Sequence, residues 1–293
     1  MPFTDLVHYL NAGRTAKPAG PTTFSTAQGR VLAHFANLQL SSQFLPIVDT
    51  TTGRIYGHAA HLQAVSLRHG TPLDPHSVFV LPYDDEEFIY LDRLVRTLHA
   101  LNYLHHPERS NLLLKVHPRH VLNVPANHGQ VFAALLRTCG LSPQQVTLEL
   151  EVGGLSSGDP VQRAITNYQA QGYHLAIHRF GRGDPNDALL EQLRPDIVRL
   201  DASQLQSPQR LRDIARKTRA IGARLLLEDG ATPQSIPHGT GELRQARPEA
   251  CNTALPQARS NLHAHPCSPR PFWRMASLTT ASDKSGDTFS IKA

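Results

Sequence analysis

Residues 174–227 read HLAIHRFGRGDPNDALLEQLRPDIVRLDASQLQSPQRLRDIARKTRAIGARLLL, in which three short apolar runs alternate with two stretches of helical length. The apolar runs lie at 174–180, 196–200 and 224–227, and the amphipathic helical stretches at 187–193 and 209–221. Apolar strands that alternate with helices are typical of a parallel sheet that is covered by helices or closed into a barrel. This part of the sequence therefore predicts an α/β fold.

The same alternation continues towards the N-terminus. We expect further strands at 43–48, 54–62, 111–116 and 146–152, and helices at 91–104, 129–138 and 161–171. Seven strands are one fewer than a closed TIM-type (β/α) barrel contains, so we expect a barrel that is incomplete at its C-terminal end. Because exposed sheet edges invite association, the sequence also raises the prospect of a homo-oligomer formed through the open edge.

Changes of composition divide the chain into three parts. Residues 1–38 contain two short apolar-periodic stretches around a Gly/Pro/Thr-rich link, and we expect a helical lead-in there. Residues 39–236 carry the barrel pattern. Residues 237–293 contain six prolines and no sustained strand or helix period, so we expect a disordered tail. A shift of reading frame near residue 236 is the other interpretation of the change, and both stay open.

The composition argues against several classes of protein. Lys and Arg number 29 against 24 Asp and Glu, which gives a net charge of +5, and no run of five basic residues occurs. We therefore expect no dedicated nucleic-acid surface. No apolar stretch reaches the roughly 18 residues of a membrane helix, and the first residues lack the pattern of a secretory signal. We expect no membrane span and a cytoplasmic location.

Several motifs follow one another in an order that is found in a known family. Residues 44–62 read FLPIVDTTTGRIYGHAAHL, residues 172–183 read GYHLAIHRFGRG and residues 195–201 read PDIVRLD. Together these motifs resemble EAL domains, the barrel-shaped phosphodiesterases that hydrolyse cyclic di-GMP, over about residues 40–235. The resemblance implies an EAL-like TIM-type barrel with its ligand site at the C-terminal ends of the strands.

The resemblance also implies which positions would carry the chemistry. Active members hold two divalent cations, mostly through carboxylates, which polarise a phosphodiester and activate a water. The positions that would differ from the family pattern are Ala59 for the name-giving glutamate, Gln63 for the phosphate-binding arginine, Lys115 for an asparagine, His178 and Arg179 for paired aspartates, and Arg199 for a lysine. Glu149 and Glu228 are retained as remnant metal ligands. We expect no counterpart of the final strand and its glutamine.

Permanent positive charges at these positions disfavour Mg²⁺, which prefers several anionic oxygen ligands. We therefore expect no catalytic residues, no metal and no cofactor, with Mg²⁺ considered only if the metal site survives. The leading hypothesis is a catalytically inactive EAL-like regulator that binds an unidentified protein partner in cyclic di-GMP-linked signalling. One alternative is a metal-independent cyclic di-GMP receptor, and another is a residual phosphodiesterase. The candidate ligand-binding residues are Lys115, Arg179, Arg182, Arg199 and Asp201.

The acidic run Asp84–Glu87 precedes the predicted helix at 91–104. Carboxylates are favourable at a helix N-terminus because they complement the helix dipole, so a helix start is the simplest interpretation. An acidic docking site for a partner is the alternative.

Overall fold

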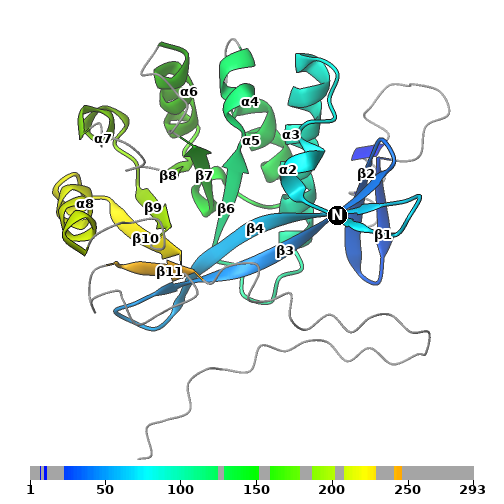
Figure 1. Cartoon of the computed structure of the whole chain (residues 1–293). Coiled ribbons are helices and arrows are strands. Elements are labelled where there is room, and N and C mark those ends of the chain that lie inside the picture. Colours follow the sequence, from blue (N-terminus) through cyan, green and yellow to red (C-terminus); the bar gives the residue numbers. More distant parts are fainter. Residues whose placement is uncertain are drawn as a thin grey trace, which may run out of the picture. The chain divides into compact units, whose positions relative to one another are not determined.

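The computed structural model describes residues 7, 10–11, 23–124, 129–151, 159–178, 187–201, 208–228 and 241–245. Within these residues, eight strands close into a barrel (Figure 1). In order around the barrel they are β3 (Leu38–Asp49), β4 (Ile55–Ser66), β6 (Asn111–Val116), β7 (Val146–Glu151), β8 (His174–His178), β9 (Ile197–Asp201), β10 (Arg224–Glu228) and β11 (Leu243–Gln245). β3 is antiparallel to both of its barrel neighbours. The predicted α/β TIM-type barrel is confirmed.

Closure of the barrel corrects the expectation of an incomplete C-terminal end. β11 pairs in parallel with β10 and antiparallel with β3. Its start is anchored on both sides, because Thr50 Oγ1 donates to the Gly241 carbonyl at 2.8 Å and the Leu225 amide donates to Glu242 Oε2 at 2.8 Å. A strand of three residues is too short to show a period in the sequence. The open barrel edge that we considered for a homo-oligomer is therefore closed in the described barrel.

The boundary at residue 236 is accordingly too early. Residues 243–245, which we assigned to a disordered tail, belong to the barrel. The rest of 237–293 lies outside the described residues, apart from 241 and 242. The described residues all belong to one compact unit, Met1–Thr253.

The N-terminal part differs from the expected helical lead-in. Strands β1 (Phe24–Ala27) and β2 (Arg30–Phe35) form an antiparallel hairpin that pairs with β3. Val31, Ala33 and Phe35 are buried and alternate with more exposed residues, which is the period of a strand. Residues 31, 35 and 38 also fit helical spacing, and for this reason the sequence alone predicts a helix here. Residues 7, 10 and 11 are helical.

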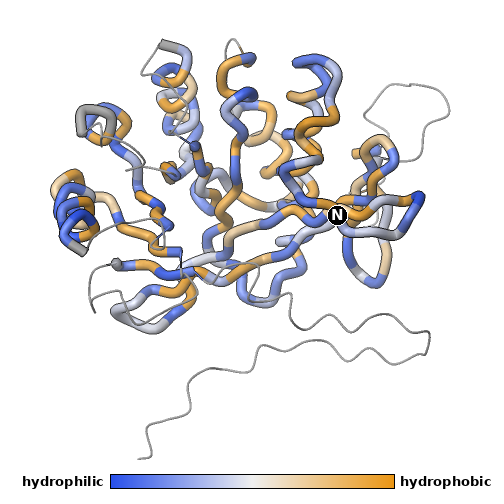
Figure 2. The backbone as a smooth tube through the Cα atoms, in the orientation of Figure 1, coloured by the Kyte–Doolittle hydropathy of each residue, from blue (hydrophilic) through white to orange (hydrophobic). Residues whose placement is uncertain are grey.

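Helices cover the outside of the barrel (Figure 1). They are α2 (Pro75–Val78), α3 (Asp85–Tyr103), α4 (Pro118–Asn123), α5 (Gln130–Thr138), α6 (Asp159–Ala170), α7 (Asp187–Leu193) and α8 (Pro208–Ala220), and a short strand β5 (Pro72–Leu73) pairs with β4. Outward-facing strand residues such as Leu148, Ile177 and Leu225 are fully buried beneath these helices. Figure 2 shows hydrophobic residues concentrated along the barrel strands, whereas α8 is hydrophilic over much of its length.

The barrel interior consists of an apolar layer and a polar layer, because every second side chain of a strand points inward. The apolar layer comprises Ile47, Ala59, Leu113, Ala176, Ile197, Leu226 and Leu243. The polar layer lies two residues further along each of six strands and consists of His61 (β4), Lys115 (β6), His178 (β8), Arg199 (β9), Glu228 (β10) and Gln245 (β11). Glu149 of β7 contacts these residues. We call these seven residues the polar layer. It lies at the C-terminal end of the parallel strands, where barrels of this type have their ligand sites.

Candidate functional site

Arg199 of β9 is the central residue of the polar layer. Its Nη1 donates to Glu149 Oε2 of β7 at 2.6 Å, and its Nη2 lies 3.4 Å from Glu228 Oε2 of β10. Arg199 is 1% exposed and Glu149 is 2% exposed, so each charge compensates the other away from water. Burial by itself would raise the pKa of Glu149, but the charges of Arg199 and Lys115 outweigh it and lower the pKa to about 2. Glu149 is therefore ionised at neutral pH.

The second oxygen of Glu149 is also engaged. His178 Nδ1 lies 3.3 Å from Glu149 Oε1. Burial lowers the pKa of His178 despite the nearby carboxylate, so its imidazole is neutral at pH 7 and can donate from Nδ1. Lys115 is the register partner of Glu149 on the neighbouring strand, and it is exposed. Among the described residues, Lys115 contributes positive charge to the layer without forming an ion pair.

β11 contributes a glutamine to the opposite side of the layer. Gln245 is buried, and its Nε2 lies 3.1 Å from His61 Nε2 of β4. Burial lowers the pKa of His61 to about 3, and the positive charges of Lys115 and Arg199 act in the same direction. Neutral His61 can therefore accept a hydrogen bond from the Gln245 amide. We expected no final strand with a glutamine, and that expectation is wrong.

The donor set of the polar layer does not fit a pair of divalent cations. Mg²⁺ prefers several anionic oxygens, whereas both oxygens of Glu149 face nitrogen groups and Glu228 contacts Arg199. Ala59, at the position of the name-giving glutamate, offers no ligand atom. In the part of the chain that the structure describes, no three His, Cys, Asp or Glu side chains are grouped to hold a metal ion.

The structure places the remaining candidate ligand-binding residues as follows. Lys115 and Arg199 belong to the same layer. Asp201 is half-buried at the end of β9, where it is the register partner of Glu228. Arg179 and Arg182 lie outside the described residues. The contact between His61 and Gln245 was not predicted from the sequence. The inward period of β4 marks His61, which stands two positions after Ala59, but no sequence signal marks Gln245.

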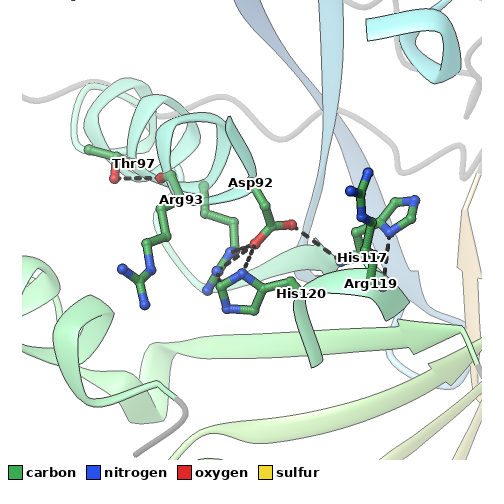
Figure 3. A network of polar contacts seen from close by, with 7 residues as sticks. Asp92, Arg93, Thr97, His117, Arg119 and His120 are labelled. Atoms are coloured by element: carbon green, nitrogen blue, oxygen red, sulfur yellow. Dashed lines mark hydrogen bonds and ion pairs between the residues drawn. The ribbon is translucent and has the colours of Figure 1, made fainter. Parts of the chain in front are cut away.

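A second buried polar network lies outside the barrel, between α3 and α4 (Figure 3). Asp92 Oδ2 of α3 accepts a hydrogen bond from Arg96 Nη2 at 2.6 Å and lies 3.2 Å from His120 Nδ1 of α4. The other carboxylate oxygen, Asp92 Oδ1, accepts a hydrogen bond from the His117 amide at 3.2 Å. Burial opposes ionisation of Asp92, but the charges of Arg96 and His120 prevail and lower its pKa. Since His117 directly follows β6, this network ties α3 to the C-terminal end of the barrel.

Comparisons with known proteins agree with this architecture. The model of the EAL domain family matches residues 28–228. A Klebsiella pneumoniae BlrP1 complex with calcium and cyclic di-GMP is similar with a TM-score of 0.59 and 19% identity, over 79% of this chain and 59% of that chain. The Bacillus subtilis YkuI protein, with an EAL domain, in complex with cyclic di-GMP and calcium is similar with a TM-score of 0.57 and 18% identity, over 66% of this chain and 50% of that chain. The Xanthomonas citri FimX EAL domain in complex with cyclic di-GMP is similar with a TM-score of 0.60 and 16% identity, over 71% of this chain and 85% of that chain.

At these identities the likeness to the solved structures shows the fold. The chain spans 59% and 50% of the lengths of BlrP1 and YkuI. A comparison with curated proteins gives no match. Among the described helices, none has the length and apolar content that crossing a bilayer requires. The family match covers more than two thirds of the sequence, and the closed barrel is the fold of the structural neighbours. This chain belongs to the EAL domain family.

Proposed function

We propose that this protein is a catalytically inactive EAL-domain regulator that acts through protein–protein interaction in cyclic di-GMP-linked signalling. The observation that supports this most strongly is the contact of one guanidinium, that of Arg199, with both remnant acids, Glu149 and Glu228. A divalent ion at Glu149 would have to displace Arg199. Displacement would separate this buried guanidinium from Glu149, the nearer of its two acidic partners, which is unfavourable away from water.

Family membership supports the signalling context. BlrP1, YkuI and the FimX EAL domain are each described in complex with cyclic di-GMP. This chain retains the closed barrel and a polar layer at the C-terminal end of the strands. The barrel is thus preserved while the donor set for a metal pair is replaced, which is the combination expected of a domain kept for binding rather than for hydrolysis.

The test is a hydrolysis assay on the full chain with cyclic di-GMP and either Mg²⁺ or Mn²⁺, with chromatographic detection of the linear dinucleotide. Glu149→Gln, purified in the same way, is the matched control, because it removes the remnant ligand and carries the same contaminating activities. We expect equal, background-level product from both proteins. Turnover by the unmodified chain that Glu149→Gln lacks would contradict the proposal.

A metal-independent cyclic di-GMP receptor is the second candidate, and the exposed ammonium of Lys115 is the observation that favours it. Against it, the two cations Lys115 and Arg199 share this end of the barrel with three carboxylates, Glu149, Asp201 and Glu228, so the balance of these five residues does not favour a dianionic ligand. Calorimetric titration in EDTA separates the candidates. The receptor requires micromolar binding that Lys115→Ala weakens, whereas the leading proposal predicts no binding heat.

A further inference from the structure

The chain between α2 and α3 exposes three large apolar side chains. Val80 is 82% exposed, Leu81 is 51% exposed and Tyr83 is 95% exposed, while Pro82 between them is buried. Single exposed apolar residues are common on soluble proteins and need no explanation, but three within four consecutive residues are a concentration of exposed apolar side chains that calls for one. We call residues 80–83 the apolar rim.

The backbone of the apolar rim is fixed at both of its ends. The amides of Val80 and Leu81 each donate to a carbonyl of α2 at 3.3 Å. The amide of Tyr83 donates to Glu87 Oε2 at 2.8 Å. A surface that is ordered before a partner arrives loses little conformational entropy on binding. The apolar side chains are thus presented to solvent by a held backbone.

The apolar rim lies beside the C-terminal end of the barrel. Phe79, which directly precedes the rim, stacks on His117 with ring centroids 5.6 Å apart and packs against Phe88 at 6.0 Å. His117 is the first residue after β6, the strand that carries Lys115. A partner on the rim would therefore sit at the same end of the barrel as the polar layer.

Carboxylates flank the apolar rim on its C-terminal side. Asp84, Asp85, Glu86 and Glu87 are all exposed. Asp85 pairs with Arg119, whose Nη2 lies 2.5 Å from Asp85 Oδ1. The other three carboxylates form no ion pair within the described residues. Asp84 and Glu87 accept hydrogen bonds from backbone amides at the start of α3, and the segment keeps a net negative charge. A negatively charged flank beside exposed apolar residues complements a partner whose apolar contact is flanked by positive charges.

We propose that the apolar rim is the docking surface for a partner segment with an apolar stripe flanked by lysine or arginine, an inference that rests on the proposed function above. Leu81 and Tyr83 supply the anchoring contacts, in keeping with the frequency of tyrosine among residues that dominate binding energy. The neighbouring carboxylates select for cationic partners and repel acidic ones.

The test uses two labelled amphipathic peptides of about 14 residues, or roughly four helical turns. One is built of leucine and lysine, and the other has glutamate in place of lysine. Each is titrated with the full chain and followed by fluorescence anisotropy. We expect the lysine peptide to bind at least about tenfold more tightly than the glutamate peptide. The double variant Leu81→Ser/Tyr83→Ser should lower the affinity for the lysine peptide by about tenfold or more. Val131→Ser is the matched control, since Val131 is 63% exposed on α5, outside the rim, and we expect it to change nothing.

Unchanged affinity of Leu81→Ser/Tyr83→Ser, or equal binding of the two peptides, would overturn the proposal. Circular dichroism of each variant establishes that it is folded. Tyr83→Ser alone is the second variant, because an exposed Tyr83 side chain contributes little to packing of the core. This variant must also lower the affinity for the lysine peptide. Cyclic di-GMP hydrolysis measured on the same preparations separates the two proposals: turnover that depends on Glu149 would refute catalytic inactivity, whereas the peptide affinities concern the rim alone.

Discussion

Removing the Arg199 guanidinium should leave Glu149 as an uncompensated charge in the barrel interior. In Arg199→Met the side chain keeps most of its volume but loses its charge. The pKa of Glu149 lies at about 2 against an ordinary value of 4.5 because the charges of Arg199, Lys115 and His178 outweigh the cost of burial, and Arg199 is the largest of these charges. The net stabilisation of the ionised carboxylate is about 3 kcal/mol at roughly 1.36 kcal/mol for each pKa unit. Because Glu149 is fully buried, solvent does not screen this contribution. We therefore expect Arg199→Met to lose about 3 kcal/mol of unfolding free energy at pH 7, in line with the loss of one partner from other buried pairs.

The assay is urea unfolding followed by far-ultraviolet circular dichroism. The double variant Arg199→Met/Glu149→Gln is the control, since it removes both charges and should recover most of the lost stability. The pH dependence has a defined sign. A carboxyl with a lowered folded pKa contributes stability above its unfolded value of about 4.5 and loses it as the pH falls towards 2. The difference in unfolding free energy between Arg199→Met and the unmodified protein should therefore become smaller below pH 4.5.

A loss of less than about 1 kcal/mol in Arg199→Met would mean that the pair behaves like an exposed ion pair. That result would refute the reasoning. A double variant no more stable than Arg199→Met would refute it as well, because the cost would then come from packing and not from an unpaired Glu149.

Three further predictions concern stability. Burial lowers the pKa of His58 to about 4 and the pKa values of His61 and His99 to about 3. Their neutral forms therefore stabilise the fold fully above pH 6.5, and the free energy of urea unfolding at pH 5 should fall by about 2 kcal/mol for each of these histidines relative to pH 7.5. Glu242→Ala removes an anchor of the closing strand β11 and should cost about 1–2 kcal/mol in chemical unfolding. Asp92→Asn should cost about 3 kcal/mol because it leaves a buried guanidinium unpaired, whereas Asp85→Asn, in an exposed pair, should cost less than about 1 kcal/mol by the same measurement.

Each of these has an outcome that contradicts it. Equal unfolding free energies at pH 5 and pH 7.5 would show that the three histidines are not held neutral. A Glu242→Ala protein as stable as the unmodified chain would show that β11 is held by its strand pairing alone. Equal costs of Asp92→Asn and Asp85→Asn would show that burial does not strengthen the α3–α4 network.

The sequence predicted the barrel where a strand is long enough to show its period. The apolar runs at 146–152, 174–180 and 196–200 correspond to β7, β8 and β9 because both faces of these strands are buried, one in the barrel and one beneath helices. The hairpin β1–β2 was mistaken for a helix because its apolar residues fit both periods. β11 was missed because three residues show no period, and its pairing depends on β3, which is almost 200 residues earlier in the chain.

The candidate site was predictable in its location but not in its contacts. Lys115, Glu149 and Arg199 each stand near the C-terminal end of a parallel strand, so the sequence places them in one region. Whether Arg199 faces solvent or spans two acids depends on distances across the barrel, which no local pattern contains. The contact of Gln245 with His61 joins residues 184 positions apart and could be found only from the fold.

The most direct test of the central claim is a crystal structure of the full chain grown with Mn²⁺ and cyclic di-GMP, with anomalous data collected at the manganese edge. We expect Arg199 to lie between Glu149 and Glu228, with no anomalous peak within coordination distance of either carboxylate. A manganese peak at Glu149, with the Arg199 guanidinium moved away from it, would contradict the account.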